Sequence, residues 1–213
     1  MGQKVHPIGF RIGEFIDWKA RWFASQKKTF RENLLSDLRL RKALFARLKT
    51  AGITEVIIER LTNAIAIKIK VTRPGMVIGR GGSGIEDLKL FIRRILNMGE
   101  NLKLDISVEE VNAPELSAHL VASRIASELE RRLPARRVVG RATERVMASG
   151  ALGVKVLLAG RIGGAEIARK QRSQTGSVPS QMLRANIDYA GVPALLKRGY
   201  VGVKVWIHKK EEK

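Results

Sequence analysis

The chain has 213 residues and carries 40 lysines and arginines against 20 aspartates and glutamates, a net charge of +20. Its 45% hydrophobic residues are enough for one large packed domain or two of about 100 residues, which excludes a disordered polyelectrolyte. Cysteine is absent, so disulfides, thiolate metal sites and a cysteine nucleophile are excluded too. So positive a chain favours polyanionic partners, nucleic acid before anionic membrane. No run of about 18 uncharged apolar residues predicts a membrane span, and no signal peptide is expected.

Residues 1–28 form a basic segment in which lysines and arginines are mixed with aromatic residues. Glycine and proline interrupt it, so we expect an extended N-terminal arm with little core of its own. Basic residues mixed with aromatics can follow an RNA backbone and stack on exposed bases. The candidates for such contacts are Lys4, Arg11, Lys27 and Lys28. Trp22 and Phe23 are instead expected to pack against the helix that follows.

Residues 29–110 carry the pattern of an α+β domain. Thr29 and Glu32 have the spacing of a capping box, so we expect a helix to start there. Apolar residues then recur at helical spacing until Ala51-Gly52, where glycine predicts the helix end. The remaining predicted elements are strands at 53–60 and 65–71, a helical turn at 76–78, a helix over 85–95 that ends near 97–99, and a strand at 102–108.

The stretch 77–85 holds four glycines and one arginine just before a predicted helix. Glycine allows backbone to approach a phosphate closely, and the start of a helix favours negative charge. The spacing Gly79-x-x-x-x-Gly84 matches a Walker A motif, but Ile85-Glu86 stands where lysine and serine or threonine are required. The Walker A interpretation therefore fails.

Two other phosphate-binding motifs are candidates for this loop. The letters G-x-G-x-x-G match a dinucleotide fingerprint, with Asp105 about 20 residues further on. That motif needs a strand running into its first glycine, whereas Pro74-Gly75 ends the strand too early. The G-x-x-G loop of a KH domain fits the short helix before the loop, the long helix after it and the basic composition. The predicted RNA-binding loop consists of Gly79, Arg80, Gly81 and Gly82.

Asn112-Ala113-Pro114 marks the start of a second domain over 111–208, since proline suits the first turn of a helix. Two helices are predicted, separated by Pro134, and the second ends at Ser149-Gly150. The predicted strands are 153–159, 162–170 with a turn at 163–164, 181–189 and 201–208. Residues 209–213 are expected to form a frayed tail.

Arginines crowd the junction around Pro134, with no lysine among them. Arginine can make planar, bidentate contacts with phosphate, which lysine cannot. The arginines of this junction are Arg131, Arg132, Arg136, Arg137, Arg141 and Arg145. The pattern therefore predicts a phosphate-binding surface at this junction.

Four separated segments of the sequence resemble the bacterial small-subunit ribosomal protein S-three family, in the right order. They are GQKVHP at 2–7, RPGMVIG at 73–79, GRIGGAEIAR at 160–169 and GYVGVKVWI at 199–207. The resemblance runs from residue 2 to about 208 and is far more specific than a G-x-x-G loop alone. It implies an α+β fold: a type II KH domain, with helices on a small mixed sheet, followed by a two-layer domain with two helices on a mainly antiparallel sheet.

The resemblance also implies a function. Family members are structural constituents of the head of the small (30S) ribosomal subunit; they bind 16S rRNA and line the path by which mRNA enters during translation. Implied protein neighbours are ribosomal proteins S-ten and S-fourteen, with S-four and S-five near the mRNA entrance. A cytoplasmic ribosome is expected, with an organellar one as the alternative. The rRNA contacts expected on this basis are Lys4, Arg11, Lys27, Lys28, Arg161, Arg169, Lys170 and Arg172.

The family's mRNA-entrance cluster is resembled here by Arg131, Arg132, Arg136 and Arg137. The competing interpretation is that these arginines contact rRNA phosphate alone.

The three histidines, His6, His119 and His208, are far apart and lack metal-ligand spacing, and no nucleophile–base pair can be argued. We therefore expect no enzyme activity, metal, cofactor, small-molecule substrate or membrane partner. Two alternative functions stay open: a free-standing KH regulator of mRNA and, less favoured, a dinucleotide-binding enzyme.

Overall fold

In the computed structural model of this chain, the described residues are 4–13, 16–61, 63–96 and 103–210. They fold into two compact units. One unit runs from Trp18 to Asn112, and the other joins the chain up to Asp17 with the chain from Ala113 onward. The basic N-terminal segment is therefore divided: its first part folds with the C-terminal unit and the rest with the first unit.

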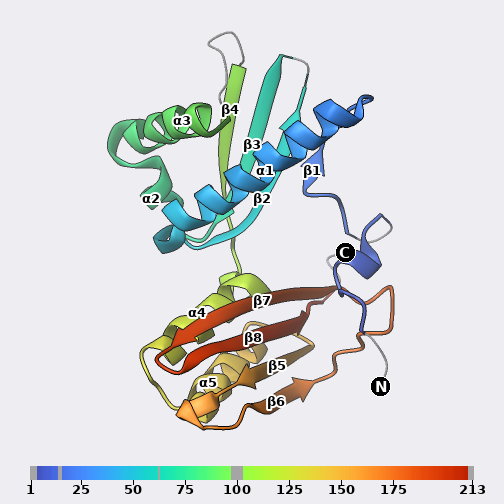
Figure 1. The fold of residues 1–213 in the computed structure, drawn as a ribbon. Helices are drawn as coiled ribbons and strands as arrows, with labels where there is room; N and C mark the ends of the chain where they lie inside the picture. Colours follow the sequence, from blue (N-terminus) through green and yellow to red (C-terminus); the bar gives the residue numbers. More distant parts are fainter. Residues whose placement is uncertain (1–3, 14–15, 62, 97–102, 211–213) are drawn as a thin grey trace. The chain divides into compact units, whose positions relative to one another are not determined.

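The unit Trp18–Asn112 is a helical layer on a four-stranded mixed sheet (Figure 1). Its sheet order is β1-β2-β3-β4, with β1 parallel to β2, β2 antiparallel to β3 and β3 parallel to β4. The elements are β1 (Ala20–Arg21), α1 (Lys27–Arg47), β2 (Ile53–Arg60), β3 (Ala64–Val71), α2 (Pro74–Ile78), α3 (Ser83–Leu96) and β4 (Lys103–Glu110). The core joins Leu40 and Leu44 of α1 with Leu88 and Ile92 of α3 and the buried residues of β2 and β3.

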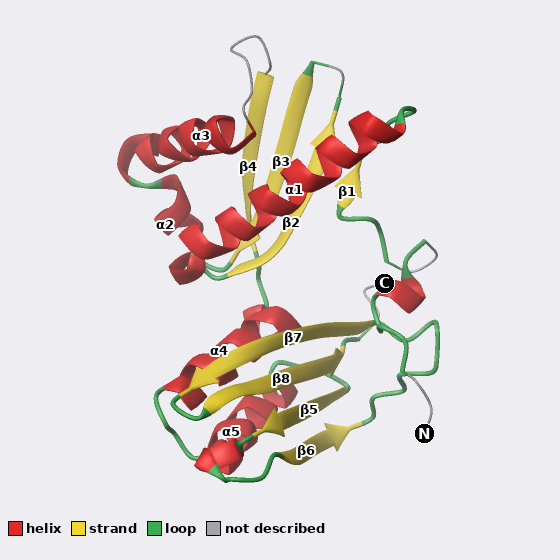
Figure 2. Ribbon diagram, in the orientation of Figure 1, coloured by secondary structure: helices red, strands yellow, loops and turns green. Residues whose placement is uncertain are grey.

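The second unit has two helices on one face of a four-stranded antiparallel sheet of order β6-β5-β8-β7 (Figure 2). Its elements are α4 (Ala118–Glu130), α5 (Ala135–Ala148), β5 (Gly153–Gly160), β6 (Arg169–Gly176), β7 (Ile187–Leu196) and β8 (Gly199–His208). Alternate residues of β5 and β8, among them Val156 and Val205, pack against α4 and α5 residues such as Ile125 and Val146. The predicted α+β class, with a mixed first sheet and an antiparallel second sheet, is confirmed.

Several predicted boundaries in the second unit are wrong. Pro114 opens a 3-10 turn, Pro114–Leu116, and α4 begins only after Ser117. The strand predicted at 162–170 begins at Arg169, after a 3-10 turn at Ile162–Gly164. The strand predicted at 181–189 is instead β7, which runs through Pro193. Proline is tolerated there because β7 is an edge strand and needs partners on one side only.

The ends of other predicted elements also differ. Helix α1 begins at Lys27 after Gln26, with no side-chain cap, so Thr29 lies within its first turn and caps nothing. The end of α3 predicted near 97–99 lies outside the described residues, as do 211–213 of the predicted frayed tail. Lys209 of that tail is tied down: its backbone N–H donates to Asn186 and its ammonium pairs with Asp188 at 3.4 Å.

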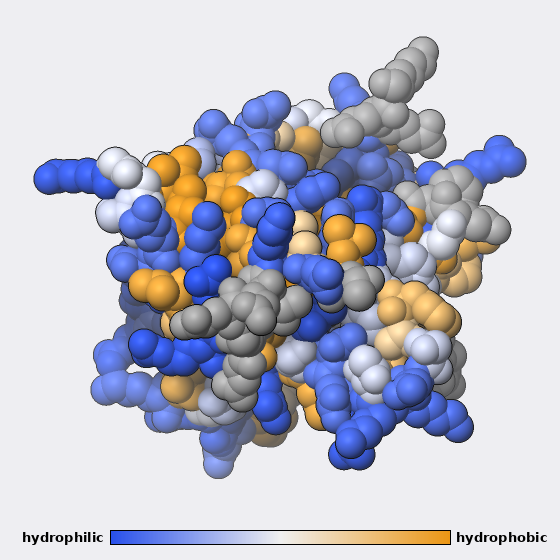
Figure 3. All heavy atoms as spheres, turned by 90° about the horizontal axis from the view of Figure 1, so that it is seen from above, coloured by the Kyte–Doolittle hydropathy of each residue, from blue (hydrophilic) through white to orange (hydrophobic). Residues whose placement is uncertain are grey.

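Helix α1 also exposes apolar side chains. Phe30, Leu34 and Leu38 are spaced four residues apart, which places them along one side of the helix; they are 49%, 42% and 55% exposed. Seen from above, the surface is mostly hydrophilic with hydrophobic patches between (Figure 3). Single exposed apolar residues are ordinary, but an apolar row along one helix is typical of a surface that a partner covers.

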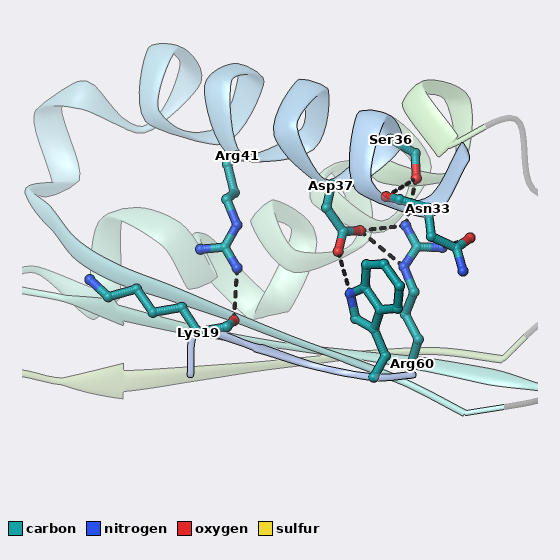
Figure 4. Close-up of polar contacts among 7 residues, drawn as sticks. Lys19, Asn33, Ser36, Asp37, Arg41 and Arg60 are labelled. Carbon is teal, nitrogen blue, oxygen red and sulfur yellow. Dashed lines mark hydrogen bonds and ion pairs between the residues drawn. The ribbon is translucent and has the colours of Figure 1, made fainter. Parts of the chain in front are cut away.

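A buried polar network joins α1 to the second part of the N-terminal arm (Figure 4). Asp37 is 3% exposed and accepts hydrogen bonds from Trp22 Nε1 at 2.8 Å and from Arg60 Nε at 3.0 Å. Arg41 donates to the carbonyls of Val56 and Lys19, both at 2.7 Å. Trp22 packs on α1 as predicted, with its ring 5.3 Å from that of Phe30. Phe23 is 90% exposed, so its predicted packing is wrong.

The first part of the arm is fixed by Arg11, which the sequence placed among the rRNA contacts. Arg11 is 1% exposed, and burial lowers the pKa of its guanidinium. Its side chain donates to four backbone carbonyls: Ala185 at 2.8 Å, Pro7 at 2.9 Å, Ser180 at 3.2 Å and Met182 at 2.6 Å. Four of its five N–H donors are used within the fold and the side chain is buried, so Arg11 is a structural residue and no longer an RNA-contact candidate.

Arg11→Ala is expected to destabilise the second unit by about 3 kcal/mol, because four carbonyls lose a charged donor inside the protein. Urea unfolding of the full chain measures the loss, and hydrogen exchange should show it first at the amides around Ala185. Arg184→Ala removes an exposed arginine from the same segment and should cost less than about 0.5 kcal/mol. Equal stability of the two variants would contradict this role for Arg11.

Candidate nucleic-acid interface

The glycine loop connects α2 to α3 and presents its backbone to solvent. Gly79 follows α2 with φ 72° and ψ 178°, and Gly81 and Gly82 also have positive φ, 63° and 85°. A Cβ on Gly81 or Gly82 would meet no atom within 4 Å. Arg80 is exposed between them. The loop thus offers open backbone and one cation immediately before the N-terminus of α3, an arrangement that suits a phosphate group.

The same geometry excludes the dinucleotide interpretation of this loop. Strand β3 ends at Val71, and the whole of α2 intervenes before Gly79. A dinucleotide site requires the strand to run directly into the first glycine, so that the glycine turn lies at the end of the sheet. Two helices that flank the loop fit the KH interpretation instead.

Gly84 has a packing role that the sequence pattern did not separate from the loop. A Cβ built on Gly84 would lie 2.5 Å from the carbonyl oxygen of Val77 and 2.9 Å from that of Ile78. Helix α3 can therefore approach α2 this closely only because residue 84 has no side chain. Gly84 sets the angle at which the two helices hold the exposed loop between them.

Gly84→Ala is expected to destabilise the first unit by about 2 kcal/mol, because the clash is with backbone atoms, which cannot rotate away. Gly82→Ala meets open space and should cost only the strain of its positive φ, about 1 kcal/mol. Denaturant unfolding of the two variants compares them directly. A larger loss for Gly82→Ala than for Gly84→Ala would contradict the assigned packing role.

The α4–α5 junction exposes all four predicted entrance arginines. Arg131 caps α4, Arg132 lies in the connection, and Arg136 and Arg137 are in the first turn of α5. None of the four makes a side-chain hydrogen bond or ion pair within the part of the chain that the structure describes. Their charges are therefore free to meet an external anion.

Two features of this junction oppose stability. Arg132 has φ 63°, the single positive φ of a non-glycine residue among those described, at a position where glycine usually ends a helix. Arg136 and Arg137 place positive charge at the positive end of the α5 dipole, with no acidic residue in the first turn. Strain and like-charge repulsion held on the surface are typical of a binding site, where an anion relieves them.

The structure extends this cluster along α5. Arg141 and Arg145 follow Arg137 at intervals of four residues, so the three lie along one side of the helix, and all are exposed. The sequence already placed both residues among the arginines of the junction, but not among the four mRNA-entrance candidates. The helical spacing of the exposed positions was the signal that could have included them.

The remaining rRNA candidates lie on exposed edges. Lys27 and Lys28 are exposed in the first turn of α1. Arg169, Lys170 and Arg172 are on β6, an edge strand whose residues are mostly exposed. Arg161 is exposed and donates to the carbonyl of Glu166 at 2.9 Å. Lys4 and Arg172, far apart in sequence, line the same hollow.

The described residues contain no group of three or more His, Asp or Glu residues placed to hold a metal ion. They also include no helix that is long and apolar enough to cross a membrane.

Comparison with known families identifies both units. Residues 39–116 match the KH domain family model. Residues 125–207 match the model described as "Ribosomal protein S3, C-terminal domain". The match of residues 39–116 includes α2, the glycine loop and α3, which agrees with the KH interpretation of that loop.

Curated relatives match almost the whole chain. The protein named small ribosomal subunit protein uS3 of Persephonella marina is 48% identical over 209 residues, covering 98% of this chain and 90% of the relative. Proteins of the same name from Clostridium novyi and Lactobacillus helveticus are 44% and 46% identical over 211 residues, covering 99% of this chain and 94% and 92% of the relatives. The chain therefore belongs to the ribosomal protein S3 (uS3) family, whose members are structural ribosomal proteins with a KH domain and not enzymes.

Proposed function

We propose that this chain is a structural constituent of the small ribosomal subunit head, where it binds 16S rRNA and lines the path by which mRNA enters. The observation that carries the proposal is the α4–α5 junction, where exposed arginines with no side-chain partner among the described residues surround a strained turn. Arginines arranged in this way attract phosphate from any RNA. Membership of the ribosomal protein S3 family is what favours the RNA of the small subunit. The names of the curated relatives support the ribosomal part of this proposal.

Two surfaces divide the RNA contacts in this proposal. The junction of Arg131, Arg132, Arg136 and Arg137 faces the message, where it separates strands electrostatically and without ATP. The glycine loop and the cations of α1 and β6 hold rRNA by its phosphates. Because lysine and arginine contacts with phosphate release counterions, rRNA affinity should fall steeply with rising salt.

Protein neighbours complete the proposed site. Ribosomal proteins S-ten and S-fourteen are the partners that the resemblance implies, with S-four and S-five near the mRNA entrance. The apolar row of Phe30, Leu34 and Leu38 on α1 supports a protein partner on the first unit, since RNA would not cover apolar side chains favourably. The relatives named above come from bacteria, so we place the protein in a cytoplasmic ribosome.

Sedimentation of the tagged chain from cells at moderate salt tests this function. The expected result is co-migration with small subunits and a discrete footprint on 16S rRNA when the bound RNA is sequenced. Scattered mRNA fragments without subunits would instead support a free-standing KH regulator. A variant with Arg80→Ala and Lys27→Ala tests the proposed rRNA surface. This variant should dissociate from small subunits at a lower salt concentration than the wild type does.

A further inference from the structure

The sheet of the second unit has a face that no helix of the described chain covers. Helices α4 and α5 lie behind the sheet in Figures 1 and 2, and the opposite face turns toward the viewer. The strand register determines what that face carries. Lys155 and Tyr189 both lie opposite Trp206, while Leu157 lies opposite both Lys204 and Arg172. Residues opposite one another in a sheet point to the same side, so two aromatic and three basic residues share this face.

The N-terminal arm closes one side of this face and forms a hollow of about 610 Å³. Its walls come from the arm around Lys4, His6 and Phe10 and from the sheet residues named above. Arg11, buried beside Phe10, fixes the arm against the segment 180–185. The hollow has the size of sites that hold small organic ligands, and Arg11 anchors the arm that builds it.

Aromatic rings form one wall of the hollow. The ring centroids of Tyr189 and Trp206 are 5.1 Å apart with their planes tilted by 43°, and His6 meets Tyr189 edge-on at 4.9 Å. Gly191 lies next to this wall: a Cβ there would meet the Tyr189 hydroxyl at 3.4 Å and Lys204 Cγ at 3.9 Å.

Positive charge gathers around the rings without compensation. The hollow is lined by Lys4, Lys155, Arg172 and Lys204 and by no carboxylate, and none of the four forms an ion pair within the described chain. Lys155 Nζ lies 5.0 Å from the centroid of the Trp206 ring. Burial, Arg172 and Lys4, in that order, lower the pKa of Lys155. An anion placed among these cations would relieve their repulsion.

We propose that this hollow binds one unpaired RNA nucleotide, with its base stacked on the Trp206–Tyr189 wall and its phosphate held by Lys155, Arg172 and Lys204. Flat rings beside unpaired cations match the two parts of a nucleotide, and sheets that bind single-stranded RNA use aromatic residues in this way. Trp206 and Tyr189 are the stacking residues, and Lys4 closes the site from the arm. This inference rests on the proposed rRNA binding and assigns a site for it away from the glycine loop.

Fluorine NMR on the full chain tests the site. The sequence has three tryptophans, so labelling with 5-fluorotryptophan gives three signals, and Trp206→Phe assigns the one from the hollow. The probe is hexauridylate, and its total binding is followed by fluorescence anisotropy. The expected result is a saturable shift of the Trp206 signal that follows the binding curve. Tyr189→Leu should raise the dissociation constant obtained from that shift about 5- to 150-fold, from the usual contribution of base stacking.

Matched variants separate the hollow from the rest of the surface. Tyr200→Leu removes an exposed tyrosine near the start of β8, and Lys197→Ala removes an exposed lysine just before that strand; both should bind as the wild type does. Lys204→Ala should weaken binding and reduce the slope of log affinity against log salt by about 0.7. Melting temperature and the unliganded fluorine spectrum verify that each variant is folded.

Three outcomes would overturn the inference. Hexauridylate that binds by anisotropy without moving the Trp206 signal would place RNA elsewhere, while co-sedimentation with 16S rRNA would still support the proposed function. Uridine monophosphate that binds as tightly as the hexamer would make the hollow a site for free nucleotides. A Tyr189→Leu variant that binds as tightly as Tyr200→Leu would remove the stacking wall. Loss of 16S rRNA co-sedimentation in the wild type would contradict the proposed function itself.

Discussion

Ribosomes that carry alanine at Arg131, Arg132, Arg136 and Arg137 are expected to translate an unstructured message at the normal rate and to pass a stable hairpin at the mRNA entrance roughly tenfold more slowly. Four screened charge contacts, each worth a fraction of a kcal/mol, add to about 1.4 kcal/mol, which is a factor of ten. The effect should appear only with structured messages, because the arginines act on strands that are being separated. Single-molecule translation through a hairpin placed at the entrance measures it.

A matched variant separates charge from geometry. Replacing the same four residues by lysine keeps the charge but removes the planar, bidentate contact that arginine makes with phosphate. We expect an intermediate delay if bidentate contacts contribute. Sedimentation must show normal small subunits for both variants, since a defect in assembly would also slow translation. Normal passage through the hairpin by the alanine variant in intact subunits would disprove the role of the junction.

Asp37→Ala is expected to lower the free energy of unfolding of the first unit by about 3–5 kcal/mol. Asp37 is 3% exposed, and its carboxylate is the shared acceptor for the Trp22 indole N–H and the Arg60 guanidinium. Removing it leaves the Arg60 charge, whose side chain is 14% exposed, without an anion inside the protein. It also weakens the attachment of the arm to α1, because Trp22 loses its hydrogen-bond partner there.

Urea unfolding followed by tryptophan fluorescence measures this loss, since Trp22 reports on the same network. Glu59→Ala is the matched control: Glu59 pairs with Arg21 at 3.4 Å and Lys68 at 3.2 Å on the surface of the same sheet. Such exposed pairs contribute little, so that variant should lose less than about 1 kcal/mol. A loss for Asp37→Ala no larger than that of Glu59→Ala would contradict the importance of the buried network.

The elements that could be predicted from the sequence are those with a strong local signal. The β-branched run 53–60 became β2 with the same bounds, Pro134 separates α4 from α5, and Gly52, with a positive φ of 71°, ends the 3-10 turn Lys49–Ala51, although α1 itself already ends at Arg47. Each of these depends on a residue and its immediate neighbours. The predicted glycine loop also lies between two helices, because its helical flanks have their own periodicity.

The elements that could not be predicted depend on distant contacts. Strand β6, with the sequence RKQRSQTG, has no apolar alternation because it is an exposed edge strand, and only pairing with β5 makes it a strand. Nothing near Arg11 in the sequence shows that its guanidinium is buried against residues 180–185. In the same way, Phe23 and Trp22 look alike in sequence, but only Trp22 has a partner, Asp37, on α1.

The candidate site shows the same division. The arginine cluster was visible because its members are close in sequence, and the structure adds that they are exposed, unpaired and next to a strained turn. The hollow on the second sheet was not visible, because Lys4, Arg172 and Trp206 come from three distant segments. Only the strand register and the path of the arm bring them together.

Site-specific photo-crosslinking tests most directly the claim that the α4–α5 junction faces the message. A benzophenone amino acid in place of Arg132 is assembled into ribosomes positioned on a defined mRNA, with the same replacement of Ser149 at the far end of α5 as the control. We expect crosslinks from position 132 to the message ahead of the decoding site, which are lost when the message is cut short of that point, and none from position 149. Crosslinks from position 132 to rRNA alone, whatever the length of the message, would contradict it.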